Sequence, residues 1–362
     1  MKRLLRLALV LLLLAIVAVG AAGFATWRKL EAFRSTPYGD PDEKVVIVPP
    51  GASARAVVRL LAHSGVLADE SRAWTYFRWV KRDRRPFRAG EYAFQGPLTP
   101  DQVLERVFEG QVKLHRFTVP EGLRIDEIAD IVGRSGLARA EDFAAVAHDP
   151  AVARALGLPF DGLEGFLFPD TYAFARGTSA RSIAEAMVAR FKDEYAKADA
   201  ARKPGVTFDM GQAATFASIV EKETGRPEER ARISCVFRNR LRIGMRLQTD
   251  PTVMYATLLR TGHWSKNITR ADLVAPHPYN TYTTAGLPPG PIANAGAAAL
   301  QATLAPDDCA DLYFVSRNDG THVFCPDLAC HNAAVHAWQV EFFRHPRDPR
   351  PASAPRDGSA SR

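Results

Sequence analysis

Hydrophobic residues follow three patterns along the chain, and each pattern predicts a different element. The segment Leu7 to Ala25 has 19 consecutive residues without a charge, which as a helix is long enough to cross a bilayer. Short apolar runs such as Val45–Val48 predict strands. Elsewhere, apolar residues recur every three or four positions, which predicts amphipathic helices. We therefore expect an α+β protein with one N-terminal transmembrane helix, followed by a small α/β module and a mixed α+β domain that contains a glutamate-bearing helix.

Charges flank the long apolar run on both sides. The basic residues within 1–6 favour a cytoplasmic N-terminus, whereas those within 28–34 reduce the charge asymmetry. A secretory signal has a hydrophobic region of about 7–15 residues, so this run fits an uncleaved anchor better. Small residues within 20–25 could still form a cleavage site, which leaves a removed signal peptide as the alternative. Either way, the bulk of the chain is expected to be exported.

The next part of the chain contains a unit that occurs twice. A strand, a glycine turn, a helix and a glycine stop run from Val45 to Gly65, and similar positions recur 71 residues later, from Phe117 to Gly136. Two generic strand–turn–helix units would look the same. From these patterns we expect a cytoplasmic N-terminus and anchor (1–27), a linker (28–43), one or more small modules (44–155), a larger C-terminal domain (156–343) and a disordered tail (344–362).

The stretch from Asp209 to Thr224 is predicted to be a helix that carries two glutamates on different faces. Asp209 is a suitable N-cap. Glu223 continues the apolar stripe, whereas Glu221 stacks on three small residues, which are Ala214, Ala217 and Ser218. A carboxylate above small side chains has room beside it for a ligand. The alternative is that both glutamates are solvated charges at a helix end.

Stiff turns rich in glycine, proline, asparagine and tyrosine follow this helix. They lie within Met245–Tyr255, Pro278–Tyr282 and Gly286–Ile292. Such turns project aromatic and amide groups, which suit sugar rings because these have apolar faces and hydroxyl edges.

Four strings in these regions resemble the YceG-like family of endolytic murein transglycosylases. They are LEGFLFPDTYAF, ASIVEKET, RLRIGMRLQTDPTVMYA and PYNTYTTAGLPPGPIANAG, and the similarity extends from about Val45 to about Val335. The resemblance implies a membrane-anchored enzyme that cuts peptidoglycan glycan strands internally, with a LysM-like module before a mixed α+β catalytic domain. It also implies one catalytic glutamate, which corresponds to Glu221.

A lytic transglycosylase needs one carboxyl group that acts twice, first as an acid and then as a base, because the substrate's own C6 hydroxyl can be the nucleophile. We expect Glu221 to do this, with its pKa raised by burial. The residues expected to bind sugar are Gln248, Tyr279, Asn280, Thr281 and Tyr282. Supporting residues are expected at Glu164, Asp170, Tyr172, Glu223 and Asp250. A hydrolytic muramidase, or a non-catalytic glycan-binding scaffold that recruits cell-wall synthases, is the alternative.

The net charge of +7 suits an acidic polymer or an anionic membrane surface. Nucleic acid is not expected, because the basic residues are scattered and no nucleic-acid motif is present. Peptidoglycan is the expected partner, and the expected location is the inner membrane, with a single span and the C-terminal domain in the periplasm. We expect no cofactor and no metal, since Cys325 and Cys330 are better placed for a local disulfide than for zinc. Cys235 is expected to be a buried helical cysteine.

Overall fold

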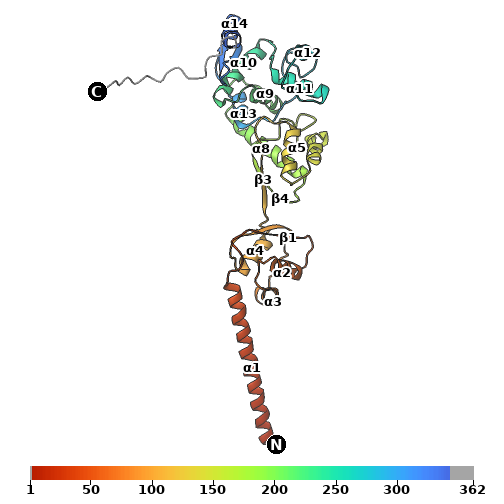
Figure 1. The fold of residues 1–362 in the computed structure, drawn as a ribbon, viewed down its shortest axis with the longest axis vertical. Coiled ribbons are helices and arrows are strands. Elements are labelled where there is room, and N and C mark those ends of the chain that lie inside the picture. The colour runs from red at the N-terminus through yellow and green to blue at the C-terminus, as the bar shows by residue number, and fades with distance from the viewer. Residues whose placement is uncertain (1, 343–362) are drawn as a thin grey trace, which may run out of the picture. The chain divides into compact units, whose positions relative to one another are not determined.

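The computed structural model describes residues 2–342, and these form a mostly helical chain with three two-stranded sheets (Figure 1). The predicted tail, 344–362, lies outside the described residues. The chain divides into two compact units. Of the described residues, the first unit contains 2–116 and 173–178, and the second contains 117–172 and 179–342. The expected mixed α+β architecture with one long N-terminal apolar helix is confirmed.

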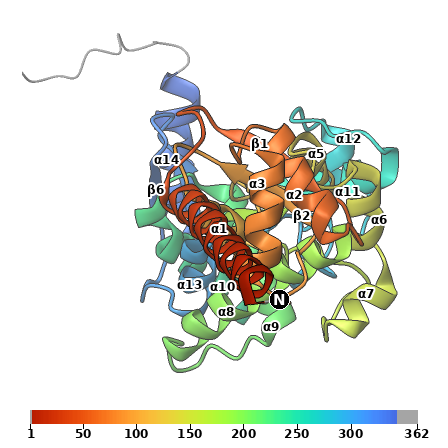
Figure 2. The same cartoon turned by 90° about the horizontal axis from the view of Figure 1, so that it is seen from below.

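The first unit packs helices against one antiparallel sheet (Figure 2). Its elements are α1 (Lys2–Ser35), β1 (Lys44–Val48), α2 (Ala54–His63), α3 (Glu70–Thr75), the π-helix η1 (Tyr76–Lys81), β2 (Gly90–Phe94) and α4 (Pro100–Glu109). In the sheet Val46 lies opposite Tyr92, and both side chains are buried. Leu61 of α2 and Leu104 of α4 complete the centre of this core.

Helix α1 continues further than the sequence predicted. Over Arg6–Ser35 it is long and apolar enough to cross a membrane, a property that a signal sequence shares. The predicted linker began at residue 28, but the helix extends through Ser35. It does so because Phe33 enters the core of the first unit, where its ring centroid lies 6.0 Å from that of Tyr76. Residues 28–35 are therefore helical, and the linker does not begin where the sequence predicted.

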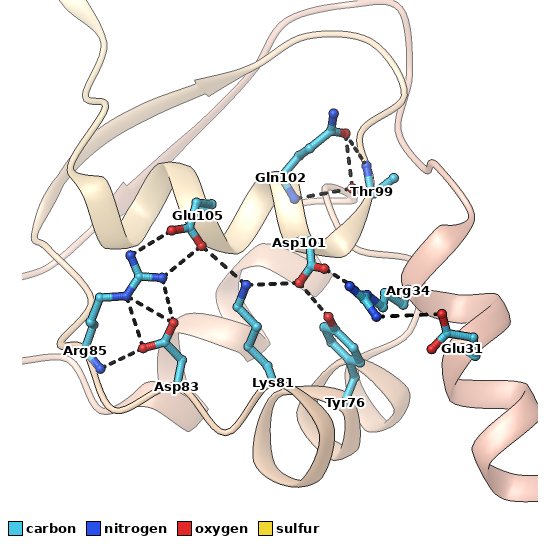
Figure 3. Close-up of polar contacts among 10 residues, drawn as sticks. All are labelled: Glu31, Arg34, Tyr76, Lys81, Asp83, Arg85, Thr99, Asp101, Gln102 and Glu105. Carbon is cyan, nitrogen blue, oxygen red and sulfur yellow. Dashed lines mark hydrogen bonds and ion pairs between the residues drawn. The ribbon is translucent and has the colours of Figure 1, made fainter.

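A polar network around Asp101 of α4 holds the end of α1 in place (Figure 3). The Asp101 carboxylate accepts hydrogen bonds from the Tyr76 hydroxyl at 2.5 Å and from Arg34 Nε at 3.1 Å. Lys81 Nζ lies 3.2 Å from the same carboxylate. One carboxylate thus joins α1, η1 and α4.

The second unit contains most of the helices. Strands β3 (Leu114–Thr118) and β4 (Thr171–Ala175) pair, and the boundary between the two units crosses both strands. The other elements are α5 (Ile125–Arg134), α6 (Ala140–Ala147), α7 (Pro150–Ala155), α8 (Ala180–Ala200), α9 (Met210–Glu223), the 3₁₀ helix η2 (Pro227–Glu229), α10 (Arg230–Arg242), α11 (Asp250–Thr261), α12 (Arg270–Val274), α13 (Ala297–Leu304), β5 (Tyr313–Ser316), β6 (His322–Cys325), α14 (Leu328–Val335) and the π-helix η3 (His336–Glu341).

Helix α9 lies at the centre of this unit. Every residue from Ala213 to Val220 is buried. Helices α10, α11 and α13 pack against it, and α8 packs against α13 (Figures 1 and 2). A helix that is apolar on all sides is expected to be enclosed in this way.

The two repeated units occur as predicted locally, but they belong to different parts of the fold. Glycines with φ of +69° and +72°, Gly65 and Gly136, follow the helices α2 and α5. Strand β1 pairs with β2, whereas β3 pairs with β4. The structure therefore divides the predicted 44–155 region near residue 116, because α5 packs on α6 and α6 packs on α8.

Both cysteine pairs form disulfides. Cys325 is bonded to Cys330, the pairing that the sequence suggested. Cys235 is bonded to Cys309, so its interpretation as a merely buried cysteine was wrong. The sequence offered no sign of this pairing, since the two cysteines are 74 positions apart and meet only when α10 packs beside the segment after α13.

Candidate active site

Helix α9 presents its two glutamates at its C-terminal end. Asp209 caps the helix through a reciprocal pair of hydrogen bonds with Gln212, the arrangement known as a capping box. At the other end Thr224 has an extended backbone and ends the helix directly after Glu223. Glu221 therefore lies in the last turn, where the surrounding loops can reach its carboxylate.

Both carboxylate oxygens of Glu221 have partners. Its Oε1 accepts a hydrogen bond from Arg230 Nη2 at 2.8 Å, and its Oε2 accepts one from the backbone N–H of Gly296 at 3.1 Å. The side chains of Glu221 and Arg230 are each only 7% exposed. The carboxylate is thus held in one position by groups from the start of α10 and the start of α13.

A second carboxylate, Glu121, lies at the same place. Arg230 Nη2 donates to Glu121 Oε2 at 3.3 Å, so one guanidinium nitrogen serves both glutamates. Glu121 is 46% exposed, in contrast to Glu221. A Cβ at position 296 would lie 1.8 Å from Glu121 Oε1, so Glu121 can occupy this position only beside a glycine.

Burial determines the direction of the pKa shift of Glu221. Removal of its carboxylate from water raises the pKa above the ordinary value for glutamate. The positive charge of Arg230 and the N–H of Gly296 oppose this rise, whereas the charge of Glu121 adds to it. The group is therefore more readily protonated than an exposed glutamate and has donors that stabilise its ionised form.

The expected space beside the small residues of α9 is filled by the protein itself. Ala214, Ala217 and Ser218 are buried, and Ser218 Oγ accepts a hydrogen bond from Ile292 N at 3.0 Å. That prediction was wrong. The small side chains let the segment before α13 approach the helix, and this approach brings Gly296 to Glu221.

Glu164 is connected to the same segment through Asn294. Its carboxylate accepts from Asn294 Nδ2 at 2.8 Å and from Ile125 N at 3.3 Å. Burial raises the pKa of Glu164 to about 8. Asn294 also accepts from Leu167 N at 2.8 Å, and it is two residues before Gly296. Through Asn294, Glu164 thus helps to hold the segment that contains Gly296, the residue whose backbone N–H binds Glu221.

Asp170 and Tyr172 make contacts elsewhere. Asp170 pairs with Arg190 of α8 at 2.8 Å, and the Tyr172 hydroxyl donates to the Phe168 carbonyl at 2.6 Å. These contacts fix the start of β4 against α8, and no hydrogen bond within residues 2–342 joins either side chain to Glu221.

Glu223 lies in a threonine network on another side of α9. It accepts a hydrogen bond from Thr249 Oγ1, and burial raises its pKa to about 7. Thr249 N in turn donates to Thr281 Oγ1 at 3.0 Å, and Thr252 lies 2.8 Å from the same hydroxyl. This network ties the end of α9 to the start of α11 and to the Pro278–Tyr282 turn.

Two of the predicted sugar-binding residues use their polar groups for hydrogen bonds within the protein. Asn280 is buried, and its Nδ2 contacts the carbonyls of Asp272, Leu273 and Ala275 at 2.8 to 3.2 Å. Thr281 is buried within the threonine network. In this structure both residues hold the shape of the turn.

The other three predicted residues have accessible groups. Gln248 is exposed and has a φ of +50°, which costs conformational energy in a non-glycine residue. Tyr282 donates to Asp250 Oδ1 at 2.7 Å. The ring of Tyr279 is partly buried, with its centroid 5.0 Å from that of Tyr255, and burial raises the pKa of Tyr279, with a smaller contribution from the charge of Glu164.

Sequence reasoning missed Glu121, Arg230, Asn294 and Gly296. Glu121 follows Pro120 in the turn of the second repeated unit, and the sequence pattern there indicates a turn but no functional role. The other three are separated from Glu221 by 9 to 75 positions, and no periodic pattern connects them.

Comparison with known proteins identifies the family. A model of the YceG-like family matches residues 46–337, a range that includes every residue described in this site. The chain belongs to the YceG-like family.

Relatives of this YceG-like protein carry one common name. The endolytic murein transglycosylase of Bacillus subtilis (strain 168) is 30% identical over 314 residues, covering 82% of this chain and 85% of that protein. The enzyme of the same name from Streptococcus pneumoniae serotype 2 is 28% identical over 74% of this chain, which spans about half (53%) of that longer protein.

A solved structure has the same fold over most of the chain. The 2.6 Å crystal structure of a YceG-like protein from Listeria monocytogenes aligns with a TM-score of 0.51 and 31% identity, and the match covers 81% of this chain and 99% of that one.

Proposed function

We propose that this YceG-like protein is a membrane-anchored endolytic lytic transglycosylase of peptidoglycan. The substrate is the glycan strand, cut within its length at the β-1,4 bond between N-acetylmuramic acid and N-acetylglucosamine. The observation that carries the proposal is the position of Glu221, a buried glutamate with a raised pKa whose carboxylate is held by Arg230 and Gly296. Relatives named endolytic murein transglycosylase support the reaction class.

In the first step protonated Glu221 gives its proton to the bridging oxygen. The bond from C1 of N-acetylmuramic acid to that oxygen breaks, and the sugar on the other side leaves as an alcohol. Burial raises the pKa of Glu221, which favours the neutral form that this step needs. The carboxylate that remains is stabilised by Arg230 and the Gly296 N–H, which already point at its two oxygens.

In the second step the same carboxylate acts as the base. It takes the proton of the C6 hydroxyl as O6 bonds to C1, which closes a 1,6-anhydro ring and returns Glu221 to its protonated state. One residue therefore completes the cycle, and no water molecule or cofactor is consumed. The contribution of such acid–base help is about 10²–10⁴-fold in rate.

Gln248, Tyr279 and Tyr282 are the residues that we propose for sugar binding. The strained backbone of Gln248 presents an exposed amide, and strain of this kind is often retained at binding sites. Asn280 and Thr281 would act by holding the turn that carries the two tyrosines. Asp250 would orient Tyr282, and Glu223 would fix the end of α9 beneath them.

The remaining parts of the chain would place the enzyme at the membrane. We propose that Leu7–Ala25 is a single inner-membrane span with the rest of the protein in the periplasm. We also propose that the first unit contains a LysM-like module that holds glycan. Peptidoglycan synthases that make new strands are a further class of partner in this proposal.

Digestion of purified sacculi with the full-length protein tests the reaction. We expect products with 1,6-anhydro ends, released from within strands and identified by mass. Reducing ends instead would indicate that water is the nucleophile and that the protein is a muramidase. Binding of sacculi without cleavage would indicate the non-catalytic scaffold.

A further inference from the structure

We propose that an exposed surface on η1 and the loop after it binds the anionic phospholipid headgroups of the membrane that α1 spans. The surface, here called the η1 surface, consists of Arg78, Trp79, Val80, Arg82 and Arg84. The inference goes beyond the enzymatic proposal, but it rests on the proposed membrane span of α1.

The η1 surface lies close to the end of the apolar part of α1. From Ala25 to Phe33 an α-helix rises about 12 Å. The Phe33 ring lies against Tyr76, the first residue of η1, with 6.0 Å between the centroids. Arg34, one residue further, contacts Asp101, which also binds Tyr76 (Figure 3). The first residue of η1 is therefore packed against α1, about 12 Å along the helix from the end of the apolar run.

The side chains of this surface suit a membrane interface. Trp79 is 63% exposed, and Val80 beside it is also exposed. Tryptophan prefers the headgroup level of a bilayer, and arginine is attracted to anionic lipids. Arg78 lies over the Trp79 ring at 5.6 Å.

The acidic residues around η1 are ion-paired with Lys81 and Arg85 and not with the arginines of the η1 surface. Asp83 is bound by Arg85, and Glu105 and Asp101 are bound by Lys81 (Figure 3). Arg78 and Arg84 have no carboxylate partner among residues 2–342. A positive surface next to a membrane span complements the negative surface of the bilayer.

The local backbone is built to expose this surface. Residues Tyr76–Lys81 form a π-helix, a rare geometry that is frequent at functional sites. Arg82, which follows it, has a φ of +48° and donates from Nε to the Trp79 carbonyl at 2.9 Å. The turn forms an open cavity of about 260 Å³ lined by Arg78, Arg82, Arg84 and Asp83, together with Phe77 and Trp79. The Asp83 carboxylate is ion-paired with Arg85, so three guanidinium groups remain for a phosphate ester, the group that every anionic phospholipid carries.

A second cavity, of about 430 Å³, lies where α1 joins the unit. It is lined by Lys29 and Phe33 of α1, by Arg72 of α3 and by Tyr38. This cavity also combines cations with apolar surface, so positive charge surrounds the end of the span on more than one side.

Depth-dependent quenching of Trp79 in bilayers tests the proposal. The full-length protein is reconstituted into vesicles of brominated phosphatidylcholine, with or without one third phosphatidylglycerol. The chain has five tryptophans, so the signal of Trp79 is the difference between wild type and Trp79→Phe. We expect quenching of Trp79 that is at least about twofold stronger with the anionic lipid and that falls at high salt.

Charge variants separate this surface from general electrostatic attraction. Arg78→Gln combined with Arg84→Gln should reduce the Trp79 quenching to the level in phosphatidylcholine alone. The control removes the same charge from exposed positions of the second unit, as Arg134→Gln with Arg154→Gln, and should leave the quenching unchanged.

Extraction with alkaline carbonate separates failure of this proposal from failure of the anchor. A chain that is extracted contradicts the membrane span and, with it, the η1 surface. A chain that stays inserted, with equal quenching in wild type and Trp79→Phe, contradicts only the η1 surface. Protection of Trp79 by added sacculi, without quenching by lipid, would assign the surface to glycan and also overturn the proposal.

Discussion

Glu221 and Arg230 form a buried ion pair, with 2.8 Å between Oε1 and Nη2. Such a pair normally favours the ionised carboxylate, and yet the pKa of Glu221 is raised, because burial outweighs the attraction to Arg230. Arg230 also contacts Glu121, so its single charge is shared by two carboxylates. In the proposed mechanism, burial favours the protonated acid, and Arg230 and the Gly296 N–H stabilise the carboxylate that remains after proton transfer.

Replacement of Glu221 by Gln should abolish the reaction while the fold survives. The amide keeps the shape of the side chain but has no proton to transfer, so both steps fail. We expect a loss of turnover of about 10⁴-fold. Glu223→Gln is the matched control, because its amide can still accept the hydrogen bond of Thr249. Both variants, matched by thermal melting, are assayed for release of anhydro-muropeptides. A folded, inactive Glu223→Gln beside an active Glu221→Gln would assign the role to the other glutamate.

Glu121→Gln should lower the pKa of Glu221. The negative charge of Glu121 raises that pKa, and its loss also leaves Arg230 to Glu221 alone. The acid form of Glu221 would then be lost at lower pH, so the alkaline limb of the pH profile of kcat/KM should move to lower pH. If the alkaline limb of the profile does not move, and the activity at lower pH equals that of the wild type, Glu121 does not influence the pKa of Glu221.

Gly296→Ala should impair activity without unfolding the protein. A Cβ at position 296 would lie 1.8 Å from Glu121 Oε1, so the exposed Glu121 side chain must move away and disturb the pairing of Arg230. Gly225→Ala is the control, because a Cβ there meets no atom within 4 Å. The measurement is turnover on sacculi, with circular dichroism to verify folding. Equal activity of the two variants would show that the pairing of Glu121 with Arg230 does not affect turnover.

Gln248→Gly should weaken substrate binding without loss of stability. Glycine tolerates a φ of +50°, so the relieved strain offsets the extra chain entropy, and a change within about 1 kcal/mol is expected. The lost amide should raise KM. Asn318→Gly, at a φ of +62° in the turn between β5 and β6, is the control and should leave KM unchanged. A wild-type KM in Gln248→Gly would remove Gln248 from the binding site.

Stability should fall as the pH rises from about 4.5 to about 7. The folded state holds a proton on Glu223, whose pKa is about 7, whereas the unfolded chain loses it near the ordinary glutamate value of about 4.3. The unfolded state therefore binds fewer protons in this window, which favours unfolding as the pH increases. Glu223→Gln should show a shallower decline in melting temperature across the same range. Identical slopes would mean that Glu223 is ionised in the folded protein.

The hydrophobic pattern of the sequence was sufficient for the local elements. The uncharged run of α1, the cap at Asp209 and the glycine stops at Gly65 and Gly136 each act over a few residues, and the structure has them where they were expected. The resemblance to the YceG-like family could also be recognised from the sequence alone, because the four strings are unusual in composition. Placement of Glu221 near the end of a buried helix follows from the same local information.

Only the tertiary structure decided which groups surround Glu221. Arg230, Gly296 and Glu121 reach it because α10, α13 and the turn after β3 pack at one end of α9, and this packing depends on contacts across 9 to 109 positions. The same reason explains the errors. Small side chains at Ala214 and Ala217 are equally compatible with a ligand or with a close-packed segment, and Asn280 is equally suited to a sugar or to three carbonyls of its own turn. A side chain's partner is set by what is brought within hydrogen-bonding distance, and long-range packing alone determines that.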